Sequence, residues 1–83
     1  MPYTDEEQQI LCEFGRRVRV ARDALGWTQE DLAEEAGLDD SYVGGVERGE
    51  RNIGLLNVNK LAVALGEPFD GFLPHRTKRR RSN

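Results

Sequence analysis

The chain has 83 residues and a formal net charge of −3, and this length predicts one small domain with a single modest core. Its one cysteine, Cys12, excludes an internal disulfide, and the lack of a signal peptide or membrane-spanning apolar run predicts a cytoplasmic protein. Residues 1–75 hold seven basic and fifteen acidic side chains, a net charge of −8 that is unusual for a protein binding nucleic acid.

The first predicted element is a helix that begins after Thr4 and runs to about Leu25. Thr4 and Glu7 can form a capping box, and Gly26 is the residue that most easily adopts the left-handed conformation ending a helix. At about 100° per residue, the apolar side chains fall on one stripe. We expect this stripe to face the core, and it consists of Leu11, Phe14, Val18, Ala21 and Leu25.

The arginines of this helix differ in their position around it. Arg22 lies at the edge of the apolar stripe, so we expect it to be partly buried and to need an anion. Two interpretations stay open for Arg16, Arg17 and Arg19. They either form a solvated face with i,i+4 pairs such as Arg19–Asp23, or they contact phosphate. Gly15 costs about 1 kcal/mol inside a helix, and we expect it to mark close packing.

Residues 28–49, TQEDLAEEAGLDDSYVGGVERG, predict two short helices joined by a turn of three residues. Thr28 and Asp31 can form a capping box for the first helix, over residues 29–36, and Gly37 ends it. A glycine-containing turn this short makes two helices cross steeply. That is the geometry of a helix-turn-helix motif.

The second helix of the pair is capped by Asp39 and reaches Arg48 before Gly49 ends it. In such a motif this helix usually lies in the DNA major groove. Val43 and Val46 face inward. The outward positions are Ser41, Gly44, Gly45 and Arg48, a surface with few of the large polar side chains that usually contact base edges. The two glycines allow a close approach of the backbone to whatever lies opposite.

Three further residues of this helix have specific expectations. Asp40 suits a helix N-terminus but would repel phosphates, or it could accept a hydrogen bond from a cytosine amino group. Ser41 is the expected direct contact to bases. Glu47 lies at the edge of the inward stripe, as Arg22 does on the first helix, and we predict an ion pair between the two.

A fourth helix is predicted over Leu55–Leu65, with Gly54 as its N-cap and Gly66 after its end. Its residues at core spacing are Val58, Leu61, Ala62 and Leu65. Pro68 can begin a short fifth helix, which Gly71 weakens and Pro74 ends, so the expected class is an all-α fold of five helices.

The apolar residues of the fifth helix are Phe69, Phe72 and Leu73. We predict that they and neighbouring residues of the fourth helix form a two-fold homodimer interface, although some of these rings could instead cap the core of the monomer. Residues 75–83, HRTKRRRSN, lack apolar side chains and are predicted to be a disordered basic tail. The domain is therefore expected to span residues 1–74.

Nothing in the sequence predicts catalysis. Cys12 and His75 have no partners at a spacing typical of a nucleophilic site, and the carboxylates are spread over helix surfaces. No glycine-rich loop of the kind that binds phosphate follows a strand. We therefore expect no enzyme activity, cofactor, metal or small-molecule ligand.

The chain resembles the phage repressor/Cro-type (Cro/C1-type, Xre-like) helix-turn-helix domain, and within that family the restriction–modification controller proteins. The resemblance covers about residues 11–73 and is carried by RVRVARDALGWTQEDLAEEAGL and SYVGGVERGERNIGLLNVNKLAVALG. It implies five helices and a homodimer that binds a palindromic operator, with dimer contacts from the last helices. It also implies the pairing of Arg22 with Glu47.

The resemblance further implies a set of DNA-binding residues. Phosphate contacts are expected at the start of the motif, from Thr28 and Gln29. Base contacts are expected from Asp40, Ser41 and Gly45 of the second helix. Contacts to the DNA backbone are expected from Tyr42, Arg48 and Arg51. Asp40, Gly44 and Gly45 depart from the larger polar or basic residues common at their positions.

Two classes of function remain. The first is a sequence-specific, dimeric DNA-binding transcriptional regulator that places helix 39–48 in the major groove of double-stranded DNA. The second is a protein-interaction module on the same scaffold, antitoxin-like or adaptor, in which the acidic body binds a protein. Steeply salt-dependent binding to DNA would separate them.

Overall fold

The computed structural model describes residues 2–71, and this part of the chain contains four α-helices, one 3-10 turn and no strand. The elements are α1 (Asp5–Ala24), α2 (Gln29–Ala36), α3 (Asp40–Glu47), α4 (Leu55–Leu65) and η1 (Phe69–Gly71). The expected all-α class is confirmed, whereas the count of five helices is wrong. None of these helices combines the length and the apolarity that crossing a membrane requires.

The predicted capping residues begin and end the helices. Thr4 Oγ1 accepts from the Glu7 amide at 3.1 Å while Glu7 Oε1 accepts from the Thr4 amide at 3.0 Å, the reciprocal bonds of a capping box. Thr28 and Asp31 form the same arrangement at the start of α2. Gly37 ends α2 with a φ of 71°, where a residue with a Cβ would be strained. Local sequence therefore sets the helix boundaries.

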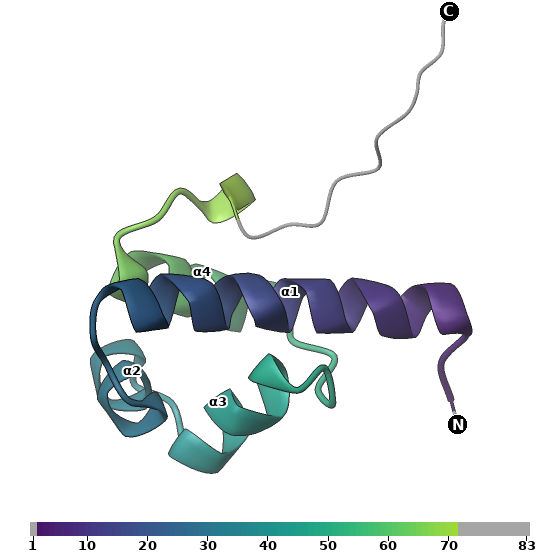
Figure 1. Ribbon diagram of the computed structural model, residues 1–83, viewed down its shortest axis with the longest axis horizontal. Coiled ribbons are helices and arrows are strands. Elements are labelled where there is room, and N and C mark those ends of the chain that lie inside the picture. Colours follow the sequence, from purple (N-terminus) through teal and green to yellow (C-terminus); the bar gives the residue numbers. More distant parts are fainter. Residues whose placement is uncertain (1, 72–83) are drawn as a thin grey trace, which may run out of the picture.

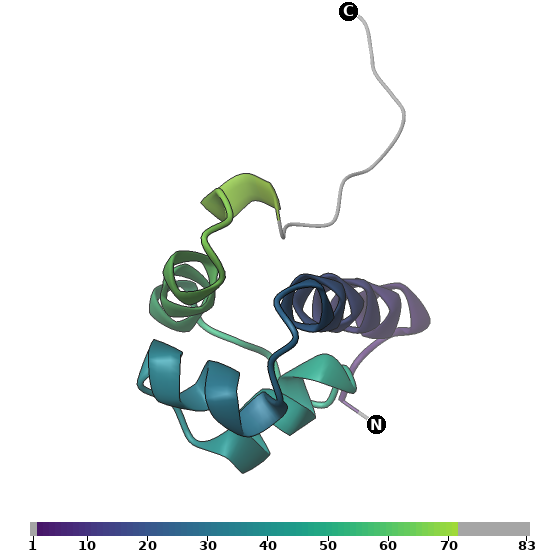
Figure 2. The ribbon, with the colours of Figure 1, turned by 60° about the vertical axis from the view of Figure 1, so that its left-hand side comes forward.

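The helices form two groups (Figure 1). α1 is the longest and runs across the whole molecule, with α4 behind it and α2 and α3 beneath it. Figure 2 shows α1 and α4 side by side above the α2–α3 pair, and η1 beyond α4. α3 packs against both α1 and α2. One side of α3 thus meets the rest of the domain and the opposite side faces away from it.

The core lies between these groups and comes from all four helices. Its buried residues are Phe14, Val18, Leu32, Ala33, Val43, Val46, Val58, Leu61, Ala62 and Leu65. Every residue predicted to face the core from α3 and α4 is buried. On α1, Leu11 and Ala21 are only half-buried and Leu25 is exposed. Leu25 was expected in the core, but it is the C-cap residue after the end of α1 and is exposed.

The predicted fifth helix is replaced by η1. Its one turn is closed by a hydrogen bond from the Gly71 amide to the Pro68 carbonyl at 2.9 Å. A three-residue turn does not meet the entropic cost of nucleating an α-helix, and Gly71 adds to that cost. Phe72, Leu73 and Pro74, together with the predicted tail over 75–83, lie outside the described residues.

Candidate nucleic-acid interface

The turn between α2 and α3 spans Gly37–Asp39 and is short enough to fix the crossing of the two helices. The Leu38 amide donates to the Ala33 carbonyl at 2.8 Å, which closes the end of α2. Ala33 is buried, and its small side chain lets the helices approach closely. This part of the chain is a helix-turn-helix, and the inner side of α3 is the side that packs on α1 and α2.

α1 and α3 approach each other closely at Gly15. A Cβ added there would overlap the carbonyl oxygens of Val46 and Glu47 at the end of α3. The expectation that Gly15 marks close packing is therefore confirmed. Further toward the N-terminus of α1, the Gln8 amide nitrogen donates to the Gly49 carbonyl at 2.7 Å. α1 thus holds the C-terminal end of α3 through backbone contacts.

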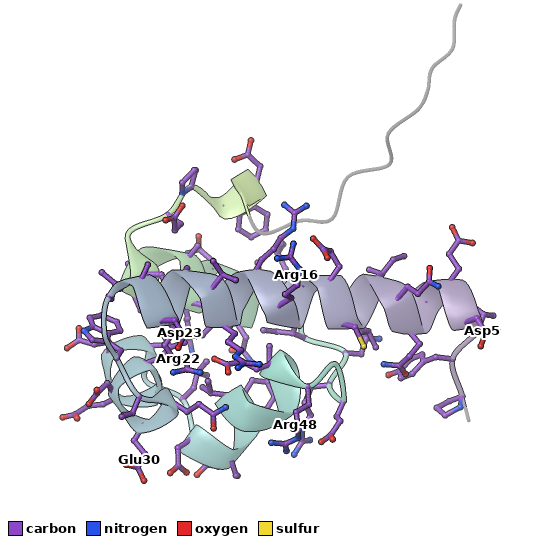
Figure 3. All side chains as sticks on the ribbon, in the orientation of Figure 1. Asp5, Arg16, Arg22, Asp23, Glu30 and Arg48 are labelled. Carbon is purple, nitrogen blue, oxygen red and sulfur yellow. The ribbon has the colours of Figure 1, made fainter. Side chains whose placement is uncertain are left out.

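The structure also brings Arg22 and Glu47 together. Arg22 Nε donates to Glu47 Oε2 at 2.7 Å and Nη2 donates to Oε1 at 2.9 Å, so the pair is bidentate. The two side chains are only 11% and 4% exposed. The hydrogen bond to Glu47 raises the pKa of Arg22 above its ordinary value. Arg22 lies on the side of α1 that faces α2 and α3 (Figure 3).

Gln29 joins this pair rather than pointing to solvent. Its Nε2 donates to Glu47 Oε1 at 3.0 Å, and the residue is half-buried. Arg22 Nη1 donates in turn to the Trp27 carbonyl at 2.7 Å. The residue proposed from family resemblance as a phosphate contact therefore already links the start of α2 to the end of α3. The sequence offered no signal for the Gln29–Glu47 bond.

The N-terminus of α3 is capped by Asp39, whose Oδ2 accepts from the amides of Ser41 at 3.0 Å and Tyr42 at 3.3 Å. The Ser41 hydroxyl donates to the same carboxylate oxygen. These bonds, chiefly the one from the Ser41 side chain, lower the pKa of Asp39. Ser41, the expected base contact, has thus used its hydroxyl proton, and its oxygen can still accept. Asp40 is exposed.

The two glycines of α3 lie on the outer side but are covered. A Cβ on Gly44 would meet Gln29 Oε1 at 3.1 Å and Arg48 Nη1 at 3.2 Å, and a Cβ on Gly45 would meet Arg51 Cγ at 3.1 Å. Both glycines are buried, because side chains from α2, from the end of α3 and from the loop that follows cover them. Because they lack side chains, the long side chains of Gln29, Arg48 and Arg51 can lie across α3.

Tyr42 and Arg51 pack against each other beside this surface. The Arg51 guanidinium lies 5.5 Å from the centre of the Tyr42 ring, a cation–π distance. The Tyr42 hydroxyl accepts from Asn57 Nδ2 at 3.1 Å, which ties the ring to α4. Asn57 had no predicted role. Its position four residues before Leu61 on α4 gave no indication that it would reach α3.

The arginines of the described residues are mostly neutralised by nearby acids. Glu13 binds both Arg16, at 2.8 Å, and Arg17, at 2.9 Å, and these hydrogen bonds lower the pKa of Glu13 to about 2. The predicted Arg19–Asp23 contact is present at 3.8 Å. These pairs agree with the interpretation of this part of α1 as a solvated face. Within residues 2–71, Arg51 is the arginine that forms no ion pair.

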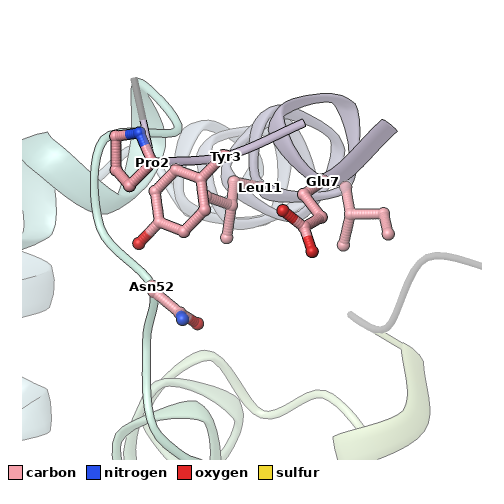
Figure 4. A pocket seen from close by; sticks show the side chains of 6 residues that line it. Pro2, Tyr3, Glu7, Leu11 and Asn52 are labelled. Atoms are coloured by element: carbon pink, nitrogen blue, oxygen red, sulfur yellow. The ribbon is translucent and has the colours of Figure 1, made fainter. Parts of the chain in front are cut away.

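A surface hollow near the N-terminus has none of the features of an active site. It lies between the N-terminal arm, α1 and the loop before α4 (Figure 4), and Pro2, Tyr3, Glu7, Ile10, Leu11 and Asn52 line it. Its one carboxylate, that of Glu7, is already bonded to the Thr4 amide. No group of three or more His, Cys, Asp or Glu side chains in the described part could hold a metal ion.

The predicted dimer residues are only partly within the described range. Phe69 is half-buried and packs against the core, as the alternative interpretation expected. Phe72 and Leu73 lie outside the described residues. On α4, however, Leu56 is 78% exposed and Val63 is 71% exposed. They are seven residues apart, about two helical turns, and so lie on the same outer face.

Several known proteins are similar to this chain in sequence and in fold. Residues 18–72 match the family HTH_3, described as helix-turn-helix. A hypothetical transcription factor from Neisseria meningitidis is 44% identical over 61 residues, which cover 74% of this chain and 58% of that protein, less than two thirds of its length. Control protein C.BamHI from Bacillus amyloliquefaciens is 43% identical over 63 residues, which cover 74% of this chain and 78% of that protein.

A solved structure of a related protein is also similar to this chain in sequence and fold. The restriction–modification controller protein C.AhdI from Aeromonas hydrophila is 52% identical and superposes with a TM-score of 0.74 over 76% of this chain and 96% of that one. The family match over residues 18–72 includes the α2–turn–α3 motif and most of the core. The chain therefore belongs to the Xre-like helix-turn-helix family, and restriction–modification controller proteins are among its relatives.

Proposed function

We propose that this protein is a transcriptional regulator that binds duplex DNA by placing α3 in the major groove. The family is one of DNA-binding regulators and not of enzymes. The observation that carries the proposal is the outer side of α3. Within the described residues, only the Gln29 side chain of α2 reaches it from another helix, and Arg48 and Arg51 lie across it, while the Arg22–Glu47 pair joins the inner side to α1.

DNA contacts on this surface would combine side chains with backbone amides. Arg48 and Arg51 supply positive charge for phosphates. The amides of Gln29 and Asp40, which the capping side chains of α2 and α3 do not bind, add donors. Ser41 can accept, and Asp40 can accept from a cytosine amino group. With few direct base contacts, half-site spacing and DNA deformability would carry much of the specificity.

The regulator would act as a two-fold dimer on a palindromic operator. Leu56 and Val63 form an exposed apolar face on α4, and Phe69 lies close to it in sequence, at the start of η1. A self-complementary contact through this face and residues 69–73 would place two α3 helices on successive turns of the groove. Sedimentation should give a dimer at micromolar concentration, and a monomer at high micromolar concentration would contradict this arrangement.

Selection from random duplexes, followed by footprinting at near-physiological salt, tests the DNA-binding proposal. We expect a protected site with two symmetric halves. Arg51→Ala should weaken binding to all sequences alike and flatten the dependence of log K on log salt by about 0.9, one phosphate contact. Deleting residues 76–83 should lower non-specific affinity more than operator preference. If selection enriches nothing and binding vanishes with those residues, the regulator proposal fails.

A protein-interaction module remains the second candidate, and the charge of the chain favours it. The net charge of −8 over residues 1–75 and the pairing of most arginines with acids leave little free positive potential on the body. For such a module, binding to duplex DNA would be weak at every salt concentration. Such a module would instead form a stable complex with a basic partner protein.

A further inference from the structure

Arg48, at the end of α3, already forms an ion pair with a carboxylate of its own chain. Its Nε donates to Glu50 Oε2 at 3.0 Å and its Nη2 donates to Glu50 Oε1 at 3.2 Å, a bidentate pair. The remaining nitrogen, Nη1, lies over Gly44. Arg48 projects from the side of α3 that faces away from α1 (Figure 3). A carboxylate therefore occupies the Nε/Nη2 edge, one of the two edges at which a guanidinium can bind a phosphate with two hydrogen bonds.

The fold does not depend on this pair. Both side chains are 59% exposed, and exposed ion pairs contribute little to stability. Arg48 and Glu50 are two residues apart in the chain, so their ion pair does not join separate elements. Its main consequence is for the availability of Arg48. The hydrogen bond from Arg48 lowers the pKa of Glu50 below its ordinary value.

We propose that Glu50 competes with DNA phosphate for Arg48 and thereby lowers the affinity of the protein for duplex DNA of any sequence. This inference rests on the proposed function. When Arg48 moves to a phosphate, Glu50 loses its partner and lies beside a polyanion. A carboxylate in that position must be repelled or must take up a cation. The competition would keep the protein from being sequestered on bulk DNA.

The exchange has a specific effect on the salt dependence. Each phosphate that a free arginine neutralises releases condensed cations from DNA, which steepens the fall of log K with log salt by about 0.9. Here the released Glu50 carboxylate takes up a cation in return, so much of that gain is lost. Glu50→Gln keeps the side-chain shape and removes the charge. This variant should therefore show the full steepening of the fall of log K with log salt.

The test is a double-mutant cycle with Glu50→Gln, Arg48→Ala and the combined variant. Binding to a random-sequence duplex is measured by anisotropy between about 50 and 200 mM salt. We expect Glu50→Gln to bind about fivefold more tightly at the lowest salt, with a slope steeper by about 0.9. In the Arg48→Ala background, the same change should alter affinity less than about twofold.

Glu67→Gln is the matched control, because it removes the same charge from an exposed residue between α4 and η1, outside the α2–turn–α3 motif. An equal gain from Glu67→Gln, or an equal gain from Glu50→Gln with and without Arg48, overturns the inference in favour of a general charge effect. Binding by the wild type with no gain from Glu50→Gln overturns this inference alone. No binding by either protein overturns the proposed function as well.

Discussion

The contacts on the inner and outer sides of α3 involve the same kinds of residue but differ in burial. On each side there is a close contact at a glycine and a bidentate arginine–glutamate pair. On the inner side, Gly15 meets backbone carbonyls and the Arg22–Glu47 pair is nearly covered. On the outer side, Gly44 meets the ends of flexible side chains and the Arg48–Glu50 pair is exposed.

Burial decides what each pair does. Removing one partner from a covered pair strands a charge away from water, whereas an exposed charge that loses its partner is simply hydrated. The inner pair is therefore a structural connection between α1 and α3. The outer pair can open and exchange its anion, as the proposed binding to DNA requires. The predictions below test this difference, beginning with the largest expected effect.

The inner pair should account for a large part of the stability. We predict that Arg22→Ala and Glu47→Ala each lower the free energy of unfolding by about 3 kcal/mol, measured by urea denaturation. Glu50→Ala is the control from the outer pair and should change it by less than about 0.5 kcal/mol. Changes below about 0.5 kcal/mol for both inner variants would show that the pairing has no structural role.

The close approach at Gly15 gives a second test of the inner side. Gly15→Ala adds about 1 kcal/mol of helix propensity but forces the new Cβ against the Val46 and Glu47 carbonyls, which are backbone and cannot move cheaply. We predict a net loss of about 1–2 kcal/mol in the free energy of unfolding. A more stable variant would mean that α1 and α3 can separate without cost.

The same substitution on the outer side should have the opposite sign. Gly44→Ala gains the helix propensity, and its Cβ meets side-chain atoms and no backbone. The exposed Arg48 can rotate away, whereas Gln29 needs to shift only slightly and can keep its bond to Glu47. We predict a rise of about 0.5–1 kcal/mol in the free energy of unfolding. DNA affinity should fall, because Arg48 is displaced. Unchanged affinity would argue against a contribution from that side-chain position.

The smallest effect concerns pH at the start of α3. Because the folded state lowers the pKa of Asp39, this carboxylate stabilises the fold above its unfolded pKa. That contribution is lost as the pH falls through the lowered folded value. Asp39→Asn should therefore show a weaker loss of stability on acidification than the wild type, followed by the thermal midpoint from neutral to acidic pH. Parallel curves would indicate that the cap does not depend on charge.

The sequence by itself determined the helices and their ends. The capping boxes at Thr4 and Thr28 and the bounds of α2 and α4 follow the prediction, because each signal involves residues within one or two turns. The edge positions of Arg22 and Glu47 on two amphipathic stripes were also enough to suggest their pairing. At η1 the local signals were weak and the predicted helix did not form.

Only the tertiary structure decided what covers the outer side of α3. Gln29 belongs to another helix and Arg51 to a loop, so no local pattern places their side chains over Gly44 and Gly45. The hydrogen bond between Asn57 and Tyr42 likewise joins residues fifteen positions apart on different helices. Periodicity tells which way a side chain leaves its helix. Where a long side chain ends depends on neighbours that only the packing of the helices brings near.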